Sequence, residues 1–183
     1  MYKMSTHILK YTKLYKKLEE SIDFENAPAI SINVNNISRR KIEGFDVGIQ
    51  IEKYTEDYKV YFRPKSVLYN NFNHNTYYNL GFDVDEAQTQ VAKTDYKTLS
   101  KILGIVVKST LEWIKKNKPD VVTMIPEGGS DKEFEKKLSI YYSILYNNKD
   151  LLSSIGYTAD RGVTSTGRPF VYIASKDLWN NKQ

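Results

Sequence analysis

The sequence of 183 residues contains no cysteine and only two histidines. The absence of cysteine excludes a disulfide framework and a thiolate metal site. His7 and His74 are far apart and lack the spacing of metal ligands. No apolar segment approaches the roughly 20 residues that span a bilayer, and the first residues lack the apolar core of a signal peptide. We therefore expect a soluble protein without a bound metal and without membrane contact.

An excess of one charge is also missing. The chain has 27 basic and 22 acidic residues, which gives a net charge of +5. Proteins that bind nucleic acid usually concentrate basic groups on one face. The nearest candidates, Lys10 to Lys17 and Arg39 to Lys41, fit solvated surfaces, so nucleic acid binding is the least favoured alternative. The 15 tyrosines, by contrast, suit wide contact surfaces or simply reflect base composition.

The first 43 residues are predicted to form an N-terminal helix and an extension. Apolar residues recur at helical spacing from Thr6 to about Ser21, with lysines on the opposite face. Alternation of apolar residues predicts a short strand over Ala29 to Val34. The polar and basic stretch from Asn35 to Glu43 is interpreted as a loop.

Three segments with a period of two follow. Apolar residues alternate with polar ones from Phe45 to Glu52, from Tyr58 to Phe62 and from Tyr78 to Val84. This pattern is typical of half-buried strands. We therefore predict a three-stranded antiparallel meander.

The second half of the chain alternates helices and strands. An apolar stripe predicts a long helix from Thr94 or Asp95 to about Asn117, and a continuous apolar run predicts a buried central strand over Val121 to Ile125. Ser130 and Glu133 form a capping-box pattern that opens another helix. Gly156 and Tyr157 turn the chain, and the last strand is predicted over Phe170 to Ala174.

These elements predict an α+β protein with a mixed, mostly antiparallel sheet flanked by helices. We expect one domain over residues 1–183, with residues 1–43 as the N-terminal helix and extension and residues 44–175 as the sheet core. The order of elements from Phe45 to Ala174 resembles the GNAT-like N-acyltransferase fold. That resemblance implies a GNAT-like topology.

The cofactor motif of that family is absent. Its members hold the acyl-CoA pyrophosphate on a loop of pattern Q/R-x-x-G-x-G/A at the start of the long helix, where backbone N–H groups bind anions. The corresponding stretch, residues 85–95, has no glycine, and Asp85, Glu86 and Asp95 would repel a pyrophosphate. We therefore expect no cofactor and no catalytic residues. The alternative is acyl transfer from acetyl-CoA to an amine with a degenerate loop, for which the resemblance implies a carboxylate such as Glu52 or a water chain as the general base and Tyr142 or Tyr146 as the acid.

A second resemblance concerns the segments 114–120, 138–142 and 156–157, which look like parts of small tailed-phage proteins. It favours a non-catalytic protein-binding module, a structural or accessory component of a phage particle, located in the host cytoplasm or in the virion. The expected partners are other virion proteins or copies of the chain itself. The segment Thr158 to Arg168 is interpreted as a loop in which Arg161 and Arg168 bind a partner's carboxylates or a phosphate, the alternative being a mobile hairpin tip.

Overall fold

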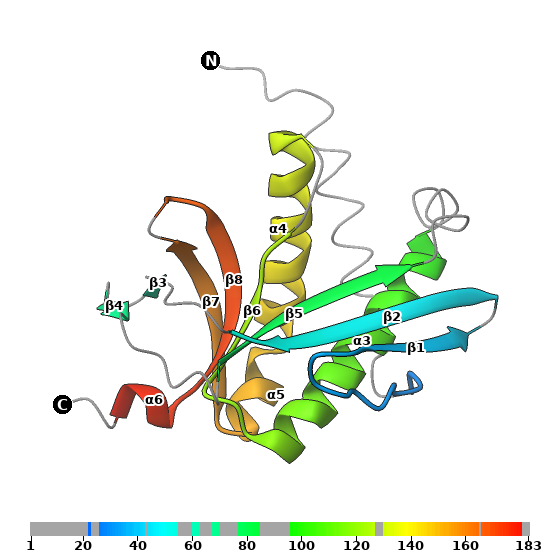
Figure 1. Ribbon diagram of the computed structural model, residues 1–183, viewed down its shortest axis with the longest axis horizontal. Helices are drawn as coiled ribbons and strands as arrows, with labels where there is room; N and C mark the ends of the chain where they lie inside the picture. The colour runs from blue at the N-terminus through cyan, green and yellow to red at the C-terminus, as the bar shows by residue number, and fades with distance from the viewer. Residues whose placement is uncertain are drawn as a thin grey trace.

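The architecture is α+β, as predicted. The computed structural model describes residues 22, 26–42, 44–54, 60–62, 67–69, 77–84, 96–126, 130–164 and 166–180. Within them lies one mixed sheet with helices packed against it (Figure 1). The predicted N-terminal helix and both histidines lie outside the described residues.

The sheet has eight strands in the order β1-β2-β5-β6-β8-β7-β3-β4. Every neighbouring pair is antiparallel except β5 and β6, which are parallel and are connected through the long helix α3. The strands are β1 (Ile37–Ile42), β2 (Phe45–Lys53), β3 (Val60–Phe62), β4 (Val67–Tyr69), β5 (Tyr77–Val84), β6 (Val121–Met124), β7 (Tyr157–Thr164) and β8 (Pro169–Ser175). The helices are α3 (Tyr96–Asn117), α4 (Asp131–Asn147), α5 (Lys149–Ser154) and α6 (Asp177–Asn180).

Two expectations about the first half of the sheet are wrong. The stretch interpreted as a loop contains β1, which pairs with β2 along its whole length. The predicted meander does not form, because β5 pairs directly with β2 while β3 pairs with β4 and β7 at the far end of the sheet. Local alternation predicts that a segment is a strand, but it does not specify the partner.

The predicted elements of the second half are confirmed. The four residues of β6 are all buried, as expected for a central strand. The Ser130 hydroxyl accepts a hydrogen bond from the Glu133 backbone N–H, and the Glu133 carboxylate accepts one from the Ser130 N–H. Gly156 has a φ of 85°, which favours glycine at this turn. The interpretation of Thr158 to Arg168 as a loop is wrong, since β7 runs from Tyr157 to Thr164 and pairs with β8.

The main core lies between the helices and one face of the sheet. Alternate residues of β2 and β5 point toward α3, and Tyr78 meets Trp113 edge-on with ring centroids 4.9 Å apart. Burial of this apolar surface is the main stabilising term of the fold. The largest fully buried aliphatic side chains of this core are Ile49, Ile51, Ile114, Leu138, Leu152 and Ile173.

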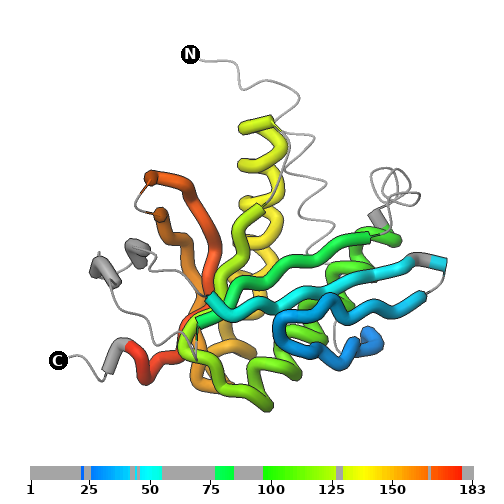
Figure 2. Tube along the Cα trace, viewed as in Figure 1, coloured from blue at the N-terminus to red at the C-terminus, as the bar shows by residue number. Residues whose placement is uncertain are grey.

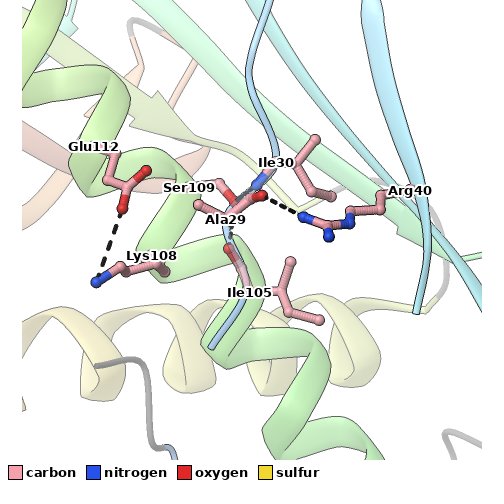
Figure 3. Close-up of polar contacts among 7 residues, drawn as sticks. All are labelled: Ala29, Ile30, Arg40, Ile105, Lys108, Ser109 and Glu112. Carbon is pink, nitrogen blue, oxygen red and sulfur yellow. Dashed lines mark hydrogen bonds and ion pairs between the residues drawn. The ribbon is translucent and has the colours of Figure 1, made fainter. Parts of the chain in front are cut away.

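Residues 26–36 cross α3 as an irregular strap before β1, so the strand predicted over Ala29 to Val34 is also wrong (Figure 2). The Ile30 N–H donates to the Ser109 hydroxyl at 2.8 Å, and that hydroxyl donates to the Ile105 carbonyl at 2.6 Å. Arg40 donates to the Ala29 carbonyl at 3.0 Å (Figure 3). The Ser109 hydroxyl and the Arg40 guanidinium thus form hydrogen bonds with backbone groups of the strap that a neighbouring strand would otherwise bind.

One buried polar contact joins the end of α3 to β7. The Tyr157 hydroxyl donates to the Pro119 carbonyl at 2.9 Å, and burial, with Asp120 and Asp177 nearby, raises the pKa of this phenol to about 12. Replacement of Tyr157 by Phe leaves the carbonyl without its donor. We expect Tyr157→Phe to lower the free energy of unfolding at neutral pH by about 1–2 kcal/mol.

This stability difference depends on pH. Between pH 10 and 12 the unfolded phenol loses its proton while the folded one keeps it, so stability falls as pH rises through this window. The gap between wild type and Tyr157→Phe should therefore narrow from pH 10 to pH 12 in urea unfolding followed by circular dichroism. A gap of constant size across that range would contradict the assignment.

Candidate functional site

The candidate site lies where β5 and β6 separate. The two strands pair only through Tyr77–Asn79 and Val121–Thr123. Beyond them β5 continues beside β2, whereas β6 turns toward α4 (Figure 1). Within the described residues, no strand pairs with the β6-facing edge of β5 from Leu80 to Val84.

An open cleft of about 220 Å³ occupies this separation. One wall comes from the strands and carries polar side chains, and the other comes from the end of β6 and from α4. Ile37, which also lines it, is 48% exposed and is one of three exposed large hydrophobic side chains in the described part. The cleft is lined by Ile37, Gly48, Gln50, Glu52, Asn79, Leu80, Gly81, Phe82, Asp83, Met124, Ile125, Lys137 and Tyr141.

An ion pair crosses the polar wall above a glycine. Arg39 on β1 contacts Asp83 on β5 at 2.7 Å, and it reaches over Gly48 of the intervening strand β2. A Cβ atom at Gly48 would stand 2.4 Å from the Asp83 carboxylate and 3.1 Å from the Arg39 guanidinium. The lack of a side chain at Gly48 therefore permits the contact.

The helix side of the separation is closed by the chain itself. Ile22 packs against the cluster of Leu103 and Ile144, which joins α3 to α4, and Phe82 of β5 packs there as well. A small apolar cavity of about 40 Å³ remains beneath, and it shares Leu80, Phe82, Met124 and Tyr141 with the cleft. The cleft is therefore accessible from the side that carries the polar side chains, and apolar packing closes it on the side of the helices.

The residues named for acyl transfer do not come together. Glu52 lines the cleft and accepts a hydrogen bond from the Gln50 amide. Tyr142 lies instead beneath the Arg161 guanidinium, and Tyr146 is 53% exposed beside it. The tyrosine of the cleft is Tyr141, which is not among the residues expected to take part in acyl transfer. Consecutive residues of a helix point about 100° apart, so Tyr141 faces the cleft while Tyr142 faces Arg161.

Arg161 and Arg168 do not lie on a common loop. Arg161 belongs to β7, with its guanidinium carbon 4.2 Å from the centre of the Tyr142 ring. Arg168 lies in the β7–β8 connection, where it donates to the Pro126 carbonyl at 2.9 Å and stands 5.2 Å from the centre of the Phe134 ring. Arg168 thus has an evident structural role, whereas the partner-binding role of both arginines stays a prediction.

The described residues contain no group of three or more histidine, aspartate or glutamate side chains able to hold a metal ion. No helix in the same part of the chain is long and apolar enough to cross a membrane. Residues 85–95, which correspond to the cofactor loop, lie outside the described part. No protein-family model matches the chain, and no curated protein or solved structure matches it at a significant level.

The two glycines of the polar wall provide a matched test. Gly48→Ala pushes Arg39 and Asp83 apart, and because both side chains are substantially exposed we expect a loss of only about 1 kcal/mol of stability. A Cβ at Gly81 meets no atom within 4 Å, so Gly81→Ala should be neutral or stabilising by up to about 1 kcal/mol. Equal effects of the two changes in chemical unfolding would contradict the proposed steric role of Gly48.

Proposed function

We propose that the chain is a non-catalytic protein-binding module that takes an extended segment of a partner protein into the cleft between β5 and β6. The observation that carries the proposal is the edge of β5, which loses its strand neighbour after Asn79. Backbone N–H and C=O groups at an open edge are a template for an added strand.

The chemistry of the cleft supports an extended peptide as the ligand. Main-chain hydrogen bonds to β5 would supply affinity, while side chains on alternate faces of the peptide would meet different surroundings. One face would meet the polar side chains Gln50, Glu52 and Asn79, and the other the apolar Phe82 and Met124.

Two features support a binding role over catalysis. The stretch that would hold an acyl-CoA pyrophosphate has no glycine and carries three acids. Ile22 also packs against the Leu103 and Ile144 cluster that joins α3 to α4, on the helix side of the cleft. The resemblance to small tailed-phage proteins makes other virion proteins, or further copies of the chain, the first partners to test.

A photo-crosslinking amino acid at position 81 tests the location of the cleft partner. Gly81 lines the cleft and has open space around its Cβ position, so a slender aliphatic diazirine side chain fits beside a bound segment without displacing the sheet. In cells that express the assembling partners, we expect a discrete crosslinked protein from position 81, identified by mass spectrometry. The control is the same group at the exposed Lys41 of β1, which does not line the cleft and should give no such product.

Gly81→Trp then tests whether the crosslinked contact is the binding contact. This side chain fills the cleft, so the partner should no longer co-purify, whereas Lys41→Trp should leave binding unchanged. Equal crosslinking at both positions, or full binding by Gly81→Trp, would contradict the proposal.

The alternative function is acyl transfer from acetyl-CoA. It is favoured by the connection of the parallel strands β5 and β6 through the long helix α3, which supports the resemblance to the GNAT-like fold, and by Glu52 in the cleft. Glu52 would then act as the general base toward an amine. Tyr141, which lines the same cleft, would take the role of the acid that is expected of Tyr142 or Tyr146.

A thermal melt with and without millimolar acetyl-CoA separates the two functions. A ligand that binds only the folded chain stabilises it by about 2.7 kcal/mol at 100 times its Kd, which is several degrees in Tm. We expect no shift. A clear rise in Tm would instead support the acyltransferase and would lead to assays of CoA release with amines.

A further inference from the structure

We infer that a second surface, the Arg161 patch, binds an acidic segment of a partner protein. The patch consists of Arg161 and Val163 on β7, Tyr142 and Tyr146 on α4, and Lys149 at the start of α5. It is distinct from the cleft, whose lining residues include none of these five. The inference therefore does not depend on the function proposed above.

The guanidinium of Arg161 is half-buried and has no polar partner among the described residues. Its Nε atom is buried without a hydrogen bond, and no hydrogen bond or ion pair of its other nitrogens occurs among the described residues. Asp160 forms no ion pair with it among the described residues, and one oxygen of its carboxylate accepts a hydrogen bond from the Arg161 backbone N–H. A buried donor left without an acceptor is costly, so such a group in a folded protein points to a missing ligand or ion.

The contact with Tyr142 prepares this group for a carboxylate. The ring lies against the guanidinium carbon at 4.2 Å and therefore covers the face of the planar group. The terminal Nη–H groups lie in the plane of the guanidinium, so an anion can approach them from the edge, whereas the Nε atom is itself buried. Carboxylates bind that edge with two parallel hydrogen bonds.

A second cation, Lys149, lies just beyond the end of α4. Lys149 stands 4.9 Å from the centre of the Tyr146 ring, and the rings of Tyr142 and Tyr146 are 5.9 Å apart. Neither cation is paired with Glu135 of α4 or Asp150 of α5 among the described ion pairs.

The patch also offers apolar surface. Tyr146 and Val163, which are 53% and 39% exposed, are two of the three most exposed large hydrophobic residues in the described part of the chain. Cations beside exposed aromatic and aliphatic groups suit a peptide that carries both acidic and apolar side chains.

Nucleic acid fits the patch less well. Single strands bind proteins by stacking bases on free aromatic faces. Arg161 covers one face of Tyr142, and Lys149 covers one face of Tyr146. The two rings also lie beside one another. The anion that the patch accepts is therefore a protein carboxylate.

The test is fluorescence anisotropy with a labelled peptide of alternating glutamate and leucine, and with labelled oligothymidine of matched length. We expect the full chain to bind the peptide and to bind oligothymidine more weakly. Arg161→Gln should weaken peptide binding by about tenfold or more, since hydrogen bonds to charged groups are lost. Arg161→Lys should recover only part of it, because lysine lacks the planar fork.

Lys115→Gln is the matched control. It removes one exposed positive charge from α3, outside the patch, and should leave peptide binding within about twofold of wild type at physiological salt. Thermal melts of all variants verify that the fold is retained. Three results would overturn the inference: no binding of the peptide by wild type, equal losses in Arg161→Gln and Lys115→Gln, or Arg161-dependent binding of oligothymidine that exceeds that of the peptide.

Discussion

The short parallel contact between β5 and β6 is the constraint on which the rest of the structure depends. It spans three residue pairs, yet it is the only strand pairing between β1-β2-β5 and the remaining strands of the described sheet. A parallel pair requires a crossover connection, and α3 provides it while covering the core face of β2 and β5. Because β6 then turns toward α4, the sheet opens and leaves one edge of β5 exposed to a ligand.

Each half of the sheet is stabilised by its own contacts on either side of this opening. In the first half, the strap over α3 is fixed by Ser109 and Arg40, and the Arg39–Asp83 contact joins β1 to β5. In the second half, Arg168 ties the β7–β8 connection to the chain after β6 through the Pro126 carbonyl. The cleft thus lies between two walls that are braced separately, which is the geometry expected of a preformed binding site.

The sequence predicts the elements better than their neighbours in space. The buried strand from Val121, the capping box at Ser130 and the turn at Gly156 follow from local patterns, and the structure contains all three. The pairing of β5 with β2 does not follow, because alternation specifies which face of a strand is buried and leaves its partner open. The strand β1 carries Arg39, Arg40 and Lys41. Its polar and basic sequence is interpreted as a loop, although charged residues are also typical of strands at a protected sheet edge.

The candidate site could be predicted only in part for the same reason. Glu52 could be named from the resemblance to the acyltransferase fold, but Gly48, Asn79 and Tyr141 become neighbours only through strand register and the packing of α4. The unpartnered state of Arg161 is invisible in the sequence, since it depends on which acids the fold brings near. Asp160 is adjacent in the chain, yet its carboxylate binds a backbone N–H instead.

The central claim is that β5 has an open edge beyond Asn79, and amide hydrogen exchange of the isolated chain by NMR tests it most directly. We expect slow exchange for amides of β5 that face β2, and exchange faster by orders of magnitude for alternate amides between Leu80 and Val84 that face away from β2. Uniform protection of all amides in that segment would contradict the account, because the edge would then already be occupied.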